Sequence, residues 1–156
     1  MMIEYVVGFY FDLGRNSVVL IRKDHPEWQA GLLNGVGGKI EGEETPLRAM
    51  QREFLEETGK QVDDWNLFTS IRGKEYRIFF FYALADKKCP VIFGLEELGI
   101  KSTLKNEPLI LEDVMDVING QATYELASDV PWLVAMADSF ARGSHADPLI
   151  IIEPEA

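Results

Sequence analysis

The stretch that most constrains this chain is Gly38–Lys60, with the sequence GKIEGEETPLRAMQREFLEETGK. It joins a glycine-rich turn to a segment with clear helix boundaries. Thr45 is a typical N-cap, and Pro46 suits the first helical position, where an N–H would have no partner inside the helix. Gly59 is a typical residue just beyond a helix end. These signals predict a helix over residues 46–58.

One face of this predicted helix is apolar. Leu47, Met50, Phe54 and Thr58 recur at i, i+3, i+7 and i+11. This spacing places them on one stripe of an α-helix, and we expect that stripe to pack inward.

The other face of the helix carries carboxylates. Glu53, Glu56 and Glu57 stand at i, i+3 and i+4 and therefore share one face, where their like charges repel. A cation is expected among them, and a divalent metal is the best candidate because Mg²⁺ prefers oxygen ligands. A solvated acidic helix face fits the charge pattern equally well, so the pattern alone leaves both interpretations open.

Residues beside these carboxylates can orient them. Arg52 can reach Glu56 one helical turn later, and Glu44 lies near the helix start. Both could hold metal ligands in place from outside the coordination shell. Gly37 and Gly38 would let the backbone approach an ion without interference from a side chain.

The rest of the chain alternates short strands with a few helices. Residues 23–34 form an expected irregular loop, and residues 75–84, apolar on both faces, predict a central strand. This mixture favours an α/β or α+β sandwich. Strands are expected over residues 2–12, 17–22, 35–40, 65–72, 75–84, 91–93, 108–111 and 149–152, and helices over 111–118 and 129–142.

Length and charge limit the function classes. The 156 residues are expected to form one domain, 1–156, and the net charge of −11 disfavours long nucleic acids as partners. No apolar run is long enough for a membrane span, and the N-terminus lacks the features of a signal peptide. Cys89 is the only cysteine, which fits a cytoplasmic protein.

The spacing of the fixed residues in the opening stretch resembles the signature of the Nudix hydrolase family, G-x5-E-x7-R-E-U-x-E-E-x-G-U, where U is a bulky apolar residue. Gly38, Glu44, Arg52-Glu53-Phe54, Glu56-Glu57 and Gly59 occupy its positions. Lys60 departs from the pattern, because an apolar residue is usual there. It lies beyond the helix end, so the departure concerns packing and leaves the carboxylates intact.

The resemblance implies a Nudix-type α/β/α sandwich with a mixed sheet. It also implies a hydrolase that depends on Mg²⁺ or Mn²⁺ and cleaves the pyrophosphate linkage of a nucleoside diphosphate derivative. The expected partner is a small nucleotide, with no membrane involved, and a homodimer is left open.

Site residues follow from the same resemblance. Glu56 and Glu57 would be metal ligands, together with the Gly37 carbonyl, and Glu53 would be either a ligand or the general base. Glu53 and Glu56 make up the catalytic set together with Arg52. The signature stretch of residues 38–60 is named the acidic box. In such enzymes a carboxylate outside the acidic box often joins the metal shell. Glu107 is the first choice for this ligand and Glu97 is the second.

The sequence specifies the substrate less clearly than the reaction. The turn with Val36 before the glycines is similar to the nucleoside triphosphate branch of the family, including enzymes that act on oxidised purine nucleotides, whereas relatives selecting ADP-ribose often have Pro there. Asp129 and Trp132 resemble a pair that reads a purine edge, although Asp129 also suits a helix N-cap. Trp28 could stack on a base or anchor its own loop.

Two other functions remain as alternatives. One is a pyrophosphatase acting on ADP-ribose or on another nucleotide sugar or dinucleotide. The other is a nucleotide-sensing protein that keeps the fold without catalysis, although such a protein would be expected to lose box carboxylates, and this chain retains all of them.

Overall fold

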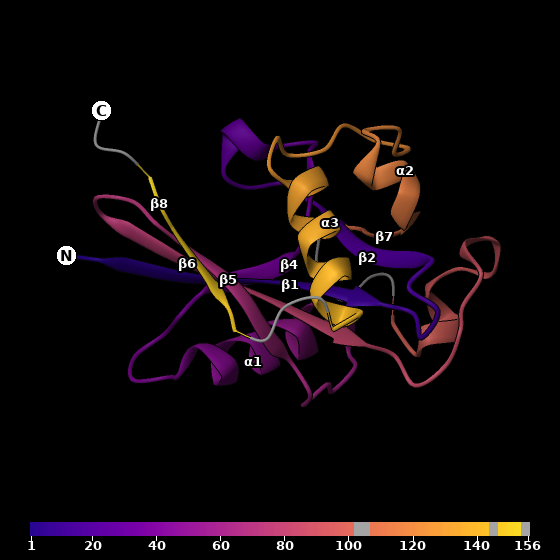
Figure 1. Ribbon diagram of the computed structural model, residues 1–156, viewed down its shortest axis with the longest axis horizontal. Coiled ribbons are helices and arrows are strands. Elements are labelled where there is room, and N and C mark those ends of the chain that lie inside the picture. The colour runs from indigo at the N-terminus through magenta and orange to yellow at the C-terminus, as the bar shows by residue number, and fades with distance from the viewer. Residues whose placement is uncertain (102–106, 144–146, 154–156) are drawn as a thin grey trace.

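A mixed β-sheet lies at the centre of the computed structural model, with one helix below it and two above (Figure 1). The structure describes residues 1–101, 107–143 and 147–153. No helix in these ranges is both long and apolar enough to cross a membrane. The strands are β1 (Ile3–Phe11), β2 (Ser17–Arg22), β3 (Leu33–Asn34), β4 (Val36–Lys39), β5 (Asn66–Arg72), β6 (Tyr76–Leu84), β7 (Leu109–Asp113) and β8 (Leu149–Ile152). The helices are α1 (Pro46–Thr58), α2 (Val114–Ile118) and α3 (Val130–Ala141), with 3₁₀ turns η1 (Glu27–Gln29), η2 (Val91–Phe93) and η3 (Leu95–Leu98).

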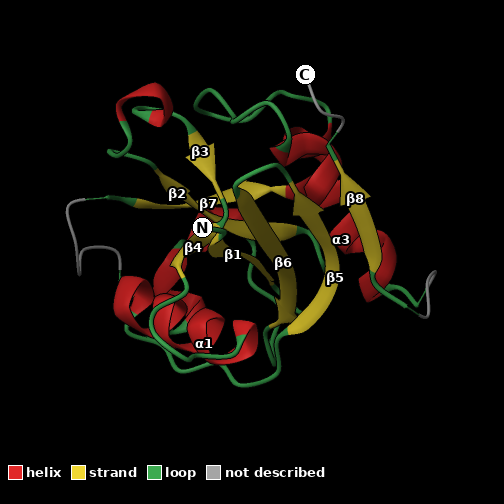
Figure 2. Ribbon diagram, turned by 90° about the vertical axis from the view of Figure 1, so that its left-hand side faces the viewer, coloured by secondary structure: helices red, strands yellow, loops and turns green. Residues whose placement is uncertain are grey.

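The sheet runs in the order β3-β2-β1-β6-β5-β8, with β4 paired to β1 and β7 paired to β2 (Figure 2). The central pair, β1 and β6, is parallel, whereas β1 forms the expected antiparallel hairpin with β2. The first half of β1 pairs with β4, which brings Val6 opposite Gly38. This pairing places the glycine-rich turn on the middle of the sheet, next to helix α1. The observed layers confirm the predicted α/β/α sandwich.

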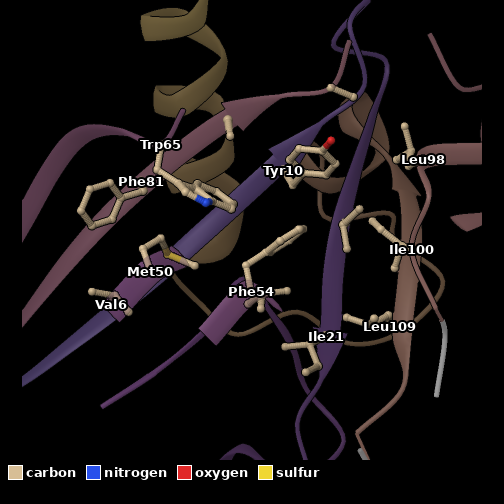
Figure 3. Packing of buried hydrophobic residues seen from close by; sticks show 14 of the residues in the cluster. Val6, Tyr10, Ile21, Met50, Phe54, Trp65, Phe81, Leu98, Ile100 and Leu109 are labelled. Carbon is tan, nitrogen blue, oxygen red and sulfur yellow. The ribbon is translucent and has the colours of Figure 1, made fainter. Parts of the chain in front are cut away.

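Each face of the sheet carries its own hydrophobic core. The core on the α1 side contains Met50, Phe54, Tyr10 and Trp65, whose side chains meet in Figure 3. The Phe54 ring lies 5.1 Å from that of Tyr10 and 5.0 Å from that of Trp65, measured between centroids. The core on the other side packs under α3. Phe54 thus fixes the acidic helix on the sheet, directly beside Glu53.

Four expectations from the sequence were wrong in detail. Val91–Phe93 is a 3₁₀ turn and not a strand, because Pro90 and Gly94 bound it and Ile92 is 86% exposed. Residues 33–34 form β3 within the expected loop. The predicted helix over 111–118 is shorter, because its first residues continue β7 beside β2. Leu47 is 40% exposed, and Ala49 takes the buried position on α1 instead.

Candidate active site

Helix α1 begins and ends where the sequence predicted. Thr45 is the N-cap, and its side-chain oxygen accepts a hydrogen bond from the backbone N–H of Arg48 at 3.2 Å. Gly59 ends the helix with a φ of 74°, the left-handed conformation that favours glycine, and its N–H donates to the Leu55 carbonyl. These local signals fix which residues of the box lie on the helix and therefore which carboxylates share a face.

Gly38 is necessary because the Glu53 carboxylate lies against it. A Cβ atom added at Gly38 would lie 2.4 Å from one Glu53 oxygen and 2.5 Å from the carboxyl carbon. The carboxylate therefore fills the space that any other side chain would take. Gly37 is required for a different reason, because a Cβ there would lie 1.9 Å from the Val6 carbonyl oxygen across the strand pair.

Arg52 links three carboxylates of the box. Its Nε and Nη2 donate to the two oxygens of Glu44 at 2.8 and 2.9 Å, which is a bidentate pair. Its Nη1 donates to Glu53 at 2.8 Å and to Glu56 at 3.4 Å. Nη2 also donates to the Lys39 carbonyl at 3.1 Å, which joins the helix to β4. The predicted orienting role of Arg52 and Glu44 is thus supported by four direct side-chain contacts.

The same contacts set the charge states of the Arg52–Glu44 pair. The hydrogen bond from Arg52 holds the pKa of the Glu44 carboxyl below its usual value, although partial burial opposes the effect. The hydrogen bond to Glu44 in turn raises the pKa of Arg52 well above its ordinary range. Both groups are therefore charged at neutral pH, and the guanidinium is a permanent cation among the box carboxylates.

Burial distinguishes the three glutamates of the acidic face. Glu53 and Glu57 are only 7% and 6% exposed, whereas the Glu56 side chain is 44% exposed. A solvated acidic face, the other interpretation of the sequence, would expose all three. Burying a carboxylate costs free energy unless the group is paired with a cation or binds a metal. The burial of Glu53 and Glu57 therefore indicates that positive charge lies close to this part of the helix.

These residues fit a divalent metal in donor type. Carboxylate oxygens and a backbone carbonyl are the hard ligands that Mg²⁺ and Mn²⁺ prefer, and the glycine at position 38 leaves room for the Glu53 carboxylate. In the described ranges, however, no three His, Cys, Asp or Glu side chains converge on one point. As they lie, Glu53 and Glu56 point toward Arg52.

Glu107 makes contacts that the sequence did not predict. One of its carboxylate oxygens accepts hydrogen bonds from the backbone N–H groups of Asp24, at 2.5 Å, and His25, at 3.5 Å. The other oxygen lies 3.7 Å from the ammonium of Lys23. Glu97, the second candidate for a metal ligand outside the box, is exposed on η3. A metal-binding role for either carboxylate stays a prediction.

The three expected nucleotide-binding residues lie away from α1. Trp28 is on η1 in the loop between β2 and β3 and is 75% exposed, so it does not anchor that loop by burial. Trp132 is 41% exposed on α3. Asp129 occupies the N-cap position of α3, but its side chain makes no capping hydrogen bond. The plain N-cap interpretation of Asp129 therefore loses its main support.

The environment of Asp129 changes its acidity. Burial raises the pKa of the Asp129 carboxyl above its usual value, and the negative charge of Glu153 adds to the rise. Glu153 is held by the hydroxyl of Tyr76, which donates a hydrogen bond to it. A carboxyl group with a raised pKa is more readily protonated and can then donate a hydrogen bond as well as accept one.

Sequence reasoning also missed several buried carboxylates. Asp12 accepts hydrogen bonds from the backbone N–H groups of Asn16, Ser17 and Cys89, and so ties the β1–β2 turn to a distant loop. The Asp-x-Gly-x-Asn pattern at this turn could have indicated such a role. Two further buried carboxylates belong to the architecture in the same way: Glu112 accepts from the backbone N–H of residue 123, and Asp138 pairs with two arginines.

Comparison with known proteins gives a family match and a set of similar structures. A family model of the NUDIX domain matches residues 3–109, more than half of the chain. A MutT protein from work on Aliivibrio salmonicida and Vibrio cholerae superposes with a TM-score of 0.67 at 20% identity, covering 90% of this chain and 100% of that chain. The mutator MutT protein of Bacillus halodurans gives 0.64 at 20% identity, covering 94% and 85% of the two chains.

The NUDIX domain of Shewanella oneidensis NrtR, solved with ADP ribose, gives a TM-score of 0.68 at 16% identity, covering 90% of this chain and 89% of that chain. No curated protein gives a significant match. At these low identities the superpositions show a shared fold. The matched range includes the whole acidic box and stops before α3.

Proposed function

The chain belongs to the Nudix family as a Nudix pyrophosphohydrolase, and on this basis we propose that it hydrolyses a (deoxy)nucleoside triphosphate to the monophosphate and pyrophosphate. The observation that carries the proposal is the complete box, in which Arg52 holds Glu44, Glu53 and Glu56 together beside Gly38. An oxidised purine nucleotide is included among the candidate substrates.

We propose Mg²⁺ or Mn²⁺ as the cofactor of this reaction. Glu53, Glu56 and Glu57 would hold it together with the Gly37 carbonyl. The sequence also predicts Glu107 as a ligand from outside the box, an assignment that its contacts with residues 23–25 oppose. When bound, a divalent ion polarises phosphate oxygens and activates water. Support comes from the hard oxygen donors on one helix face and from the near-complete burial of two of them.

The residues of the chain then have distinct tasks. Arg52 fixes the Glu53 carboxylate by a hydrogen bond of 2.8 Å, and its own position is fixed by the bidentate pair with Glu44. Glu53 would accept a proton from the attacking water if it is not itself a ligand. Because Glu53 is nearly buried, that proton acceptor would be shielded from bulk solvent.

Support for a purine substrate comes from the other face of the sheet. The Asp129 side chain does not cap α3, and burial raises the pKa of its carboxyl group. It could therefore form hydrogen bonds with a base edge. Trp132 and Trp28 present exposed rings that could stack on a base. The Val36 turn remains the sequence argument for a triphosphate over ADP-ribose.

A substrate screen tests the proposal. Purified protein with Mg²⁺ or Mn²⁺ is incubated with a panel of nucleotides, and products are identified by mass spectrometry in ¹⁸O-water. A nucleoside monophosphate and pyrophosphate are expected, and the label shows which phosphorus is attacked. The double variant Glu56→Gln with Glu57→Gln should lose activity. Full activity of that variant would refute the metal-site assignment.

The panel also decides between the alternatives. ADP-ribose belongs in it because the similar NrtR domain was solved with ADP ribose. Preferred cleavage of ADP-ribose, a nucleotide sugar or a dinucleotide would replace the triphosphate proposal. Tight nucleotide binding with no turnover under either metal would favour a sensing protein.

The remaining expectations concern the state of the protein in the cell. A single domain over residues 1–156, a cytoplasmic location and a homodimer stay proposals. Light scattering of the purified chain measures its mass in solution and so tests the homodimer directly.

A further inference from the structure

The loop of residues 23–32 connects β2 to β3 and is closed at its base by two backbone hydrogen bonds. The N–H of Lys23 donates to the Leu32 carbonyl, and the N–H of Gly31 donates to the Lys23 carbonyl, both at 2.8 Å. The loop carries Trp28, which is 75% exposed. No apolar side chain of residues 23–32 is buried. The position of the loop therefore depends on the contacts made by its first residues.

Glu107 provides that hold from a different part of the chain. Its carboxylate accepts from the N–H groups of Asp24 and His25 and lies 3.7 Å from the Lys23 ammonium. The Glu107 side chain is 14% exposed and that of Lys23 is 19% exposed. Both oxygens of this carboxylate therefore have partners in the loop, one with the two backbone N–H groups and the other with the lysine.

The sheet register places the contact between Glu107 and residues 23–25 at the end of the β2–β7 pair. Ile21 of β2 pairs with Leu109 of β7, and both pack with Phe54 of α1 in one core. Lys23 and Glu107 each lie two residues beyond this pair. Both residues lie just outside the two strands, and the η1 turn that carries Trp28 lies on the α3 side of the sheet, opposite α1 (Figure 1). The loop base also borders a hollow of about 230 Å³ lined by Arg22, Lys23, Asp24, Gly31 and Pro108.

We propose that Glu107 is a positioning residue that fixes the loop of residues 23–32, and through it Trp28, beside the bound nucleotide, and that it is not a metal ligand. This inference rests on the proposed function. A metal at Glu107 would compete with Lys23 for one carboxylate oxygen or with the N–H groups of Asp24 and His25 for the other. The contacts with residues 23–25 give Glu107 a structural role that requires no ion.

The two roles predict opposite behaviour of Glu107→Gln. The glutamine keeps an oxygen that can accept from the Asp24 N–H, but it is a neutral and poor metal ligand. For a positioning residue, Glu107→Ala should raise the KM for the preferred nucleotide about tenfold with kcat and the half-saturating Mg²⁺ concentration unchanged, and Glu107→Gln should restore most of the KM. The matched control is Glu27→Gln, an exposed carboxylate in the same loop, which should behave as wild type.

A double-mutant cycle tests whether Glu107 acts through Trp28. Trp28→Ala should raise KM by itself, and adding Glu107→Ala to it should change KM little, because the loop no longer carries the stacking ring. Amide hydrogen exchange at Asp24 and His25 should accelerate in Glu107→Ala, a readout that requires no catalysis.

Three results would overturn the proposal. One is a higher Mg²⁺ requirement with lower kcat in both Glu107 variants, which would make Glu107 a ligand. Another is an unchanged KM in Glu107→Ala. The third is full additivity with Trp28→Ala. If the wild type binds nucleotides without cleaving them, the proposed function fails, and the same comparisons are made on Kd; if it binds none, both proposals fall.

Discussion

Replacing Gly38 with alanine should specifically disable the acidic box. The added Cβ would lie 2.4 Å from a Glu53 oxygen, whereas ordinary contacts begin near 3.4 Å, so the carboxylate must retreat by about 1 Å. Such a displacement also stretches the 2.8 Å bond from Arg52 to Glu53. A misplacement of about 1 Å at a reacting group can cost on the order of 10²-fold in rate, and this is the expected loss in kcat.

The effect on stability separates displacement from misfolding. If Glu53 moves aside, the melting temperature should change little. If it cannot move, overpacking costs roughly 1–3 kcal/mol, which lowers Tm by about 2–4 °C for each kcal/mol in a chain of this size. The assay is steady-state hydrolysis of the preferred nucleotide, with circular dichroism melting of the same samples.

A matched substitution controls for the general effect of a glycine-to-alanine change. At Gly14, in the turn after β1, an added Cβ would lie 2.9 Å from the side-chain amide nitrogen of Asn16, the far end of a flexible group. Gly14→Ala should therefore retain normal kcat. The reasoning is refuted if Gly38→Ala keeps kcat within about threefold of wild type at an unchanged Tm.

Further predictions concern charge and capping. The folded pKa of Glu44 lies below its ordinary 4.5, so its pairing with Arg52 stabilises the protein above that pH and is lost as the pH falls through the folded value; Glu44→Gln should flatten the acid limb of a Tm-against-pH curve, and an unchanged limb would contradict this. The hydrogen bond to Glu153 raises the pKa of Tyr76 to about 12, so this stabilisation is present below pH 10 and disappears as the pH rises through about 12; ultraviolet titration should show that step moving toward 10 in Glu153→Gln. Thr45→Ala removes the side-chain cap of α1 and should cost about 1 kcal/mol in denaturant unfolding.

The acidic helix was readable from the sequence because its signals are local. Thr45, Pro46 and Gly59 act on the backbone within a few residues of themselves, so their roles do not depend on the rest of the fold. The strands β2 and β8 were also placed correctly by their apolar runs. In contrast, residues 91–93 have strand-forming side chains but pair with no strand in the described part of the chain, and only the tertiary structure shows this.

The contacts around the box divide in the same way. The spacing of Arg52 and Glu56 predicted their contact because both lie on one helix. Two other contacts depend on how α1 packs over the β1–β4 pair. They are the hydrogen bond from Arg52 to the Lys39 carbonyl and the close contact of the Glu53 carboxylate with Gly38. Spacing along the chain contains no information about that packing.

The sequence by itself therefore determined the chemistry: the box residues, the helix that carries them and the family to which the chain belongs. Only the tertiary structure decided how those groups are held. It buried Glu53 and Glu57, left Glu56 exposed, released Asp129 from capping α3 and joined Glu107 to a loop some eighty residues earlier. The physical reason is range: capping and helical spacing act within a few residues, whereas burial and strand register are set by segments distant in the chain.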